Sequence, residues 1–281
     1  MKHNHGWRSA FTLIEMLTVT AIIAMLATAL VSGLKSAQRQ AHTALCQARM
    51  KNLHQACMNH LSDTGYYPYA GSYEWLDRSY QTYQERKGWV TWIRKDGKDT
   101  NPWAENNKVA HAKEYLYVGW DGENALRSVK EGSIFKYASR DTSAYFCKEF
   151  NEGKGDVRRS YAMNDWFGSR RNKLWRPRQL RNFQNDGIEP SRMGYIIELQ
   201  STETGVTQGD YDNSKPIAYD SVWEPDPNMK KERYGIWHRK SGDLHGHVIF
   251  VDGHIESLTA TTNPQGDDYQ TQNTKIRTGK H

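Results

Sequence analysis

The sequence predicts an α+β protein in which one long N-terminal helix is followed by a globular domain with an antiparallel β-sheet. Three observations lead to this fold class. An apolar segment near the N-terminus continues into a helical pattern, tyrosines and tryptophans gather from residue 66 onwards, and strand-like runs with turn signals lie towards the C-terminus. The chain of 281 residues, of which 37% are hydrophobic and 12% aromatic, is long enough to bury a core rich in large rings.

The N-terminal segment has the length and composition of a transmembrane helix. Residues 11–31 contain one charged residue, Glu15, and a helix of this length, at about 1.5 Å per residue, crosses a hydrocarbon layer of about 30 Å. Lys2 and Arg8 precede this segment without an opposing acid, so the positive-inside rule places residues 1–10 in the cytoplasm. We therefore expect a single-pass membrane protein whose C-terminal domain is extracytoplasmic.

Glu15 separates this segment from an ordinary signal peptide, which would share the basic start and the apolar run. A carboxylate inside a hydrophobic span costs about 2.5–3.5 kcal/mol on insertion scales, which indicates a function for it. If the chain is cut before Phe11, the new α-ammonium of a neighbouring copy can neutralise Glu15 within the apolar layer. Such pairing predicts that helices pack side by side and that Glu15 acts in assembly.

The helical pattern continues beyond the membrane. Small and apolar residues recur every three to five positions, and basic residues occupy the other faces. No proline interrupts residues 11–62, which predicts a helix about 78 Å long at about 1.5 Å per residue. The helix is expected to end before Gly65, and its second half to lie against the globular domain, residues 63–281.

The clearest strand signal is a hairpin within residues 247–258, where two strand-like runs flank Asp252 and Gly253. An Asp-Gly pair between such runs predicts a type I′ turn, which needs positive φ at both central residues. In this register Phe250 faces Ile255. Two earlier runs are also strand-like: residues 194–199 and 234–238.

Residues 9–17, SAFTLIEML, resemble the cleavage and methylation motif of type IV prepilins and type II secretion pseudopilins. The resemblance implies that a prepilin peptidase cuts between Ala10 and Phe11 and methylates the new N-terminus. It also implies that Glu15 guides assembly of a filament and that the fold is pilin-like. The expected partners are further copies of the chain, the peptidase, the membrane, and a pilus or secretion assembly machinery in the bacterial inner membrane and periplasm.

The rest of the chain is similar to a pilin-like subgroup that carries a C-terminal His…Asp-Gly motif. In this sequence the motif is formed by His238, Asp252 and Gly253. Segments at the expected helix end, residues 51–55, and in the middle of the chain, residues 159–164, are also similar to that subgroup. We take the three motif residues as candidate site residues.

Histidines crowd the motif region, which invites a metal or acid/base interpretation. However, His254 is expected about 13 Å along the strand from His247, so the spacing does not bring three ligands together. We interpret these residues as exposed hairpin histidines rather than as a metal site. They are His238, His245, His247 and His254.

Asp210, Asp212 and Asn213 are weak candidates for a calcium site, because they offer closely spaced oxygen ligands and the resemblance to major pseudopilins implies such a site. They lack the glycine and the closing glutamate of an EF-hand loop, so a solvated turn is the preferred interpretation. No other metal or cofactor is expected. No nucleophile elbow or phosphate loop is present in the sequence, and no enzyme activity is predicted.

The three cysteines leave their pairing open. Cys46 and Cys57 lie about 16 Å apart along one helix and cannot pair with each other. Cys147 can bridge to either of them, or all three can stay as thiols. The net charge of +6 is spread among acids, which is typical of a solvated surface and excludes a nucleic-acid footprint.

The leading functional hypothesis is a structural subunit of a type IV pilus-like or type II secretion pseudopilus filament. The alternative is a membrane-anchored binding module for an extracytoplasmic glycan or protein, and a third is an anchored enzyme. Dependence of self-assembly on Glu15 distinguishes the first hypothesis from the other two.

Overall fold

The computed structural model describes residues 12–71, 73–75, 83–85, 88–90, 122–150, 156–168, 178–199, 221–223, 234–235, 238–240 and 243–259. The chain divides into two compact units, Met1–Thr43 and Ala44–His281. The second unit therefore begins within the long helix. The sequence pattern placed the start of the globular domain later, at residue 63. Within the described residues the fold is α+β, as predicted.

The helix α1 spans Leu13–Thr64, 52 residues without interruption. It ends close to the predicted position, because Gly65 adopts a φ of 77° and donates its N–H to the carbonyl of Leu61 at 2.8 Å. Phe11, the first residue of the predicted helix, lies outside the described residues.

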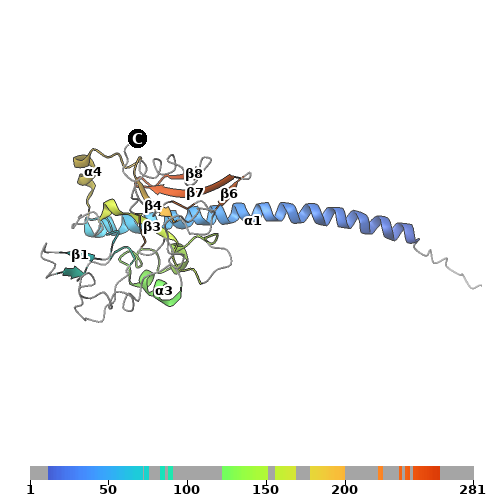
Figure 1. Ribbon diagram of the computed structural model, residues 1–281, viewed down its shortest axis with the longest axis horizontal. Helices are drawn as coiled ribbons and strands as arrows, with labels where there is room; N and C mark the ends of the chain where they lie inside the picture. The colour runs from blue at the N-terminus through green and yellow to red at the C-terminus, as the bar shows by residue number, and fades with distance from the viewer. Residues whose placement is uncertain are drawn as a thin grey trace, which may run out of the picture. The chain divides into compact units, whose positions relative to one another are not determined.

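The part of α1 that belongs to the second unit contributes one face to its core. The side chains of that face are completely buried: Cys46, Met50, Leu53, Ala56 and Cys57. Their spacing of three or four residues is that of one helix face, which explains why small and apolar residues recur there. In the view of Figure 1, strands β7 (Asp243–Phe250) and β8 (Ile255–Thr259) lie on one side of this part of α1 and α3 (Gly122–Glu131) lies on the other.

A six-stranded sheet organises the part of the second unit that the structure describes. The remaining strands are β3 (Tyr161–Asn164), β4 (Gly194–Glu198), β5 (Val222–Trp223) and β6 (His238–Lys240). The order is β5-β3-β4-β7, and β7 also pairs with β6 and β8. All pairs are antiparallel except β3 with β5, so the predicted antiparallel sheet is wrong for this one pair. The N–H of Met163 on β3 bonds to the carbonyl of Ser221, directly before β5, at 3.0 Å.

Short elements complete the described fold. A separate two-stranded sheet pairs β1 (Tyr73–Trp75) with β2 (Tyr83–Glu85). The remaining helices are α4 (Leu180–Asp186) and the 3₁₀ turns η2 (Thr142–Tyr145) and η3 (Asp165–Phe167).

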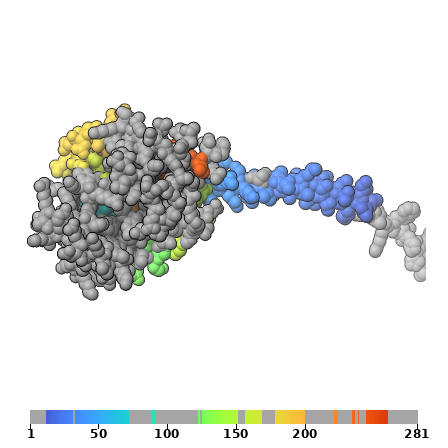
Figure 2. Space-filling view, viewed as in Figure 1, coloured from blue at the N-terminus to red at the C-terminus, as the bar shows by residue number. Residues whose placement is uncertain are grey.

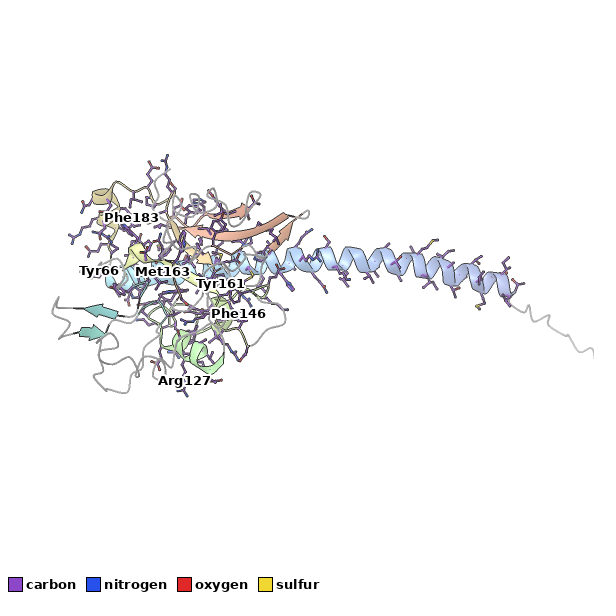
Figure 3. All side chains as sticks on the ribbon, viewed as in Figure 1. Tyr66, Arg127, Phe146, Tyr161, Met163 and Phe183 are labelled. Carbon is purple, nitrogen blue, oxygen red and sulfur yellow. The ribbon has the colours of Figure 1, made fainter. Side chains whose placement is uncertain are left out.

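Large rings fill the core, as the composition predicted. Tyr67 makes edge contacts with Phe167, Phe183 and Tyr195, with ring centroids 5.0, 5.7 and 5.9 Å apart. Trp89 and Trp223 are also fully buried. These buried rings therefore serve packing, whereas Tyr66, next to Tyr67 in the sequence, is exposed (Figure 3).

The C-terminal hairpin forms as predicted, but its register differs by one residue. Ile255 pairs with Ile249 rather than with Phe250. The loop is closed by the N–H of Phe250, which donates to the carbonyl of His254 at 2.9 Å, and by the N–H of Gly253, which donates to the carbonyl of Phe250 at 3.0 Å. Of the two central residues only Gly253 has positive φ, 92°. The predicted type I′ turn is therefore wrong, and the loop has three residues with a glycine bulge.

The register shift has a tertiary cause. Val251 lies in the loop, where its N–H donates to the carbonyl of Met193 at 3.1 Å and its own carbonyl bonds to Nε2 of His54, on α1, at 2.9 Å. In the three-residue loop the positive φ falls on Gly253, where it has no steric cost.

Candidate functional site

The N-terminal part of α1 exposes its apolar side chains. Leu13 is 85% exposed, Met25 73% and Leu30 74%. Figure 2 shows this part of α1 in blue. Of the helices that the structure describes, α1 alone is long and apolar enough to cross a membrane, judged by length and composition. A single water-soluble chain gains nothing from exposing so long an apolar surface, so this segment needs a lipid or protein environment to cover it.

Glu15 and Thr12 form a capping box at the start of α1. The N–H of Thr12 and its hydroxyl each donate to Oε2 of Glu15 at 2.8 Å, and the N–H of Glu15 bonds to Oγ1 of Thr12 at 3.3 Å. This reciprocal arrangement satisfies donors that have no partner within the helix. Glu15 thus has a local structural role that the sequence analysis did not consider.

Several predicted site residues lie outside the part of the chain that the structure describes. These are the processing residues Ala10 and Phe11 and the calcium candidates Asp210, Asp212 and Asn213. They stay predictions.

The motif residue His238 lies in a buried cluster that four separate segments assemble. Cys46 comes from α1, Cys147 from the segment after η2, Glu198 from the end of β4, and His238 from the start of β6. All four side chains are buried, and their nitrogen, oxygen and sulfur ligand atoms lie within 4.8 Å of one another. We call these four residues the Cys/His/Glu cluster.

His238 lies between two carboxylates. Its Nδ1 is 2.9 Å from Oε2 of Glu149, and its Nε2 is 3.0 Å from Oε1 of Glu198. The same Nε2 is 3.5 Å from Sγ of Cys147, which in turn lies 2.6 Å from Sγ of Cys46. The structure therefore places Cys147 beside Cys46 and not beside Cys57, and no disulfide bond joins any of the three cysteines in it.

The groups of this cluster shift one another's protonation. Burial by itself lowers the pKa of His238, but hydrogen bonds with Cys46, Glu149 and Glu198 outweigh it and raise the pKa to about 12. Burial alone would raise the pKa of Glu198, but hydrogen bonds from His238 and His247 bring it well below its usual range. The hydrogen bond with Cys147, helped by His238, lowers the pKa of Cys46 to about 6 despite burial. His238 and Glu198 therefore form a buried, directly bonded pair in which each group favours the charged form of the other.

Neighbouring groups hold the cluster in place. The backbone N–H of His247 donates to Oε2 of Glu198 at 2.9 Å, and its Nδ1 lies 3.1 Å from the same oxygen. The backbone N–H of Cys147 donates to Oγ of Ser160 at 2.6 Å. The carbonyl of Phe146, which Figure 3 labels, accepts a hydrogen bond from Arg49 on α1 at 2.8 Å, so the segment that carries Cys147 is bonded to the helix.

The histidines do not behave as one exposed group, so our interpretation of them is wrong for three of the four. His238, His245 and His247 are buried, because β6 and β7 lie inside the second unit rather than in a free hairpin. His254 is partly exposed in the hairpin loop, where Nδ1 lies 2.6 Å from Oδ1 of Asp252. Asp252 and Gly253 therefore belong to the loop and not to the Cys/His/Glu cluster.

Sequence reasoning missed Glu198 and Glu149. A signal for the first was present, because Glu198 ends the strand-like run GYIIE, whose apolar residues indicate burial on both faces. A carboxylate in such a run needs a buried partner. No comparable signal marks Glu149.

Comparison of the chain with known proteins found no matching family model, no matching curated protein and no matching solved structure.

Proposed function

We propose that this protein is a structural subunit of a type IV pilus-like or type II secretion pseudopilus-like filament. After a prepilin peptidase removes residues 1–10, the N-terminal parts of α1 from neighbouring copies pack side by side. The observation that carries the proposal is the division of α1 into an apolar, exposed part and a part whose apolar face is buried in the second unit.

Because of this division, the apolar side chains of the two parts of α1 are covered in different ways. From Cys46 onwards, the core of the second unit covers the apolar face of α1. The large apolar side chains that the structure describes between Leu13 and Leu34 are each at least 48% exposed, and this helix is long and apolar enough to cross a membrane. A bilayer covers such a surface before assembly, and helices of neighbouring copies cover it afterwards.

The capping box is compatible with a role for Glu15 in assembly. Both hydrogen bonds from Thr12 go to Oε2, and among the described residues no donor bonds to Oε1. The second oxygen is free to accept from the α-ammonium of a neighbouring copy. Glu15 would then cap its own helix and receive the next subunit through the same carboxylate.

The experiment compares Glu15→Val with Thr12→Val in cells that supply the peptidase and an assembly machinery. Both changes remove the capping box, at a typical cost of about 0.5–2 kcal/mol of helix stability. Only Glu15→Val also removes the acceptor for the neighbouring amine, and breaking a buried ion pair costs about 3–5 kcal/mol. We expect filaments in the sheared fraction to fall at least about a hundredfold with Glu15→Val and far less with Thr12→Val.

Both variants should be cut before Phe11, which mass spectrometry of the N-terminus measures. Equal assembly of wild type and Glu15→Val would contradict the proposal and favour the anchored binding module. Equal loss in both variants would show that Glu15 acts only as a cap.

A further inference from the structure

We propose that the Cys/His/Glu cluster is a buried binding site for a divalent transition metal of the Zn²⁺ class. Its donor set of two thiols, one imidazole and one carboxylate consists of the ligands that Zn²⁺ takes in proteins. This inference does not rest on the filament proposal, because all four residues belong to the second unit.

The geometry favours a closed, four-ligand site. The ligand atoms of Cys46, Cys147, Glu198 and His238 lie within 4.8 Å of one another, which is about 1 Å more than the separation of about 3.3–3.8 Å between tetrahedral donors with bonds of about 2.0–2.3 Å, so binding would draw these side chains together by a small movement. The 3.5 Å between Sγ of Cys147 and Nε2 of His238 is close to the spacing of two tetrahedral ligands. The two sulfurs, 2.6 Å apart, would separate to about 3.8 Å, as tetrahedral thiolates do at a bond length of about 2.3 Å.

The surrounding groups have the arrangement that supports metal ligands. Glu149 accepts from Nδ1 of His238 at 2.9 Å, which orients the ring so that Nε2 faces the thiols. His247 holds Oε2 of Glu198 through its N–H at 2.9 Å, while Oε1 points towards His238. The two proposed ligands His238 and Glu198 are thus each oriented by a hydrogen bond to a residue outside the cluster.

A disulfide between Cys46 and Cys147 is the competing use of the two sulfurs. It would engage two of the four converging groups and leave the buried pair of His238 and Glu198 unexplained, and such pairs are costly to bury. A metal ion uses all four groups, and on binding it releases the protons that Nε2 and the two sulfurs still hold. With four protein ligands the site is structural and ties α1 to β4 and β6.

The test uses the full chain purified in detergent under reducing conditions and measures Zn²⁺ content by elemental mass spectrometry. We expect about one Zn²⁺ per chain. Replacement by Co²⁺ should give the visible bands of tetrahedral cobalt and a thiolate charge-transfer band. Competition with a chromophoric chelator should show that Cys46→Ser weakens Zn²⁺ binding by more than about 100-fold. Replacing a residue that only hydrogen-bonds to a ligand already costs about 10–100-fold in metal affinity.

Cys57→Ser is the matched control, because Cys57 is a fully buried cysteine on the same helix outside the cluster. It should leave Zn²⁺ binding unchanged. Because Cys46→Ser also alters the core, Glu149→Gln provides a second variant, with an expected loss of about 10–100-fold. The exposed Glu189→Gln serves as its control.

Three results would overturn the inference. The first is a Cys46–Cys147 disulfide in peptide maps of protein taken from its own compartment without reduction. The second is the absence of Zn²⁺ and Co²⁺ binding by the reduced wild type. The third is equal binding by the wild type and Cys46→Ser, which would place the metal elsewhere.

Discussion

His54 shows how one side chain on α1 joins the helix to the sheet. Its ring packs edge-on against Tyr195 of β4, with centroids 5.9 Å apart, and Nε2 bonds to the carbonyl of Val251. Burial lowers the pKa of His54 below its ordinary value of 6.5, although the bond to Val251 and the charge of Asp252 act in the opposite direction. The neutral ring is therefore the form that the fold uses.

The stability of the second unit should depend on pH through His54. Folding lowers the pKa of His54. At pH values between its folded and its unfolded pKa, the imidazole is therefore protonated in the unfolded chain and neutral in the folded chain. The contribution of the neutral His54 to the free energy of unfolding is complete above about pH 6.5, and it is lost as the pH falls through the folded pKa. His54→Gln keeps a donor for Val251 but does not titrate. Urea titrations at several pH values should show a smaller loss of unfolding free energy on acidification in His54→Gln than in the wild type. If the unfolding free energy of both proteins falls equally with pH, His54 is not the group that causes the pH dependence.

At the scale of elements, the C-terminal hairpin depends on Gly253 for two reasons. Its φ of 92° lies in a region that other residues rarely adopt, and a Cβ at this position would lie 3.0 Å from Cε1 of His54. The loop and α1 therefore approach each other at a site where only hydrogen fits well.

Gly253→Ala should destabilise the second unit more than Gly187→Ala. Gly187 ends α4 with a φ of 63°, and a Cβ there meets no atom within 4 Å, so the control pays only for the left-handed backbone, about 1–2 kcal/mol. The variant at Gly253 adds the contact with His54 and a less favourable φ. Thermal or urea unfolding of both variants measures the difference, and equal losses would mean that the loop moves away from α1 without cost.

Most features of α1 could be predicted from the sequence. Its length, its end and its apolar start follow from the sequence, because periodicity and helix-ending residues act over a few positions. The capping box at Thr12 and Glu15 was readable as T-x-x-E, although the carboxylate in an apolar run directed attention to assembly instead.

At the scale of the whole molecule, the second unit needs the later part of α1. A fragment that begins at Ala44 retains the buried helix face, whereas one that begins at Asp63 lacks Met50 and Leu53, both fully buried. Removing large core side chains costs about 2–5 kcal/mol each, and a typical domain is stable by about 5–15 kcal/mol.

We therefore expect residues 44–281 to be soluble and to unfold cooperatively, and residues 63–281 to be unfolded or aggregated. Circular dichroism and thermal melts of the two fragments test this expectation. A cooperative transition in the shorter fragment would show that the helix is only an attachment to an independent core.

The sequence by itself determined the long helix, its apolar first part, the hairpin near the C-terminus and the aromatic core, since these depend on local periodicity, turn residues and composition. Only the tertiary structure decided that Cys46 meets Cys147, 101 positions away, and that His238 meets Glu198, 40 positions away. No local pattern encodes such contacts, because they depend on which strand pairs with which and on how α1 packs against the sheet. The hairpin register was decided in the same way, since the bonds that Val251 makes to Met193 and His54 fix a loop that the Asp-Gly pair alone leaves open.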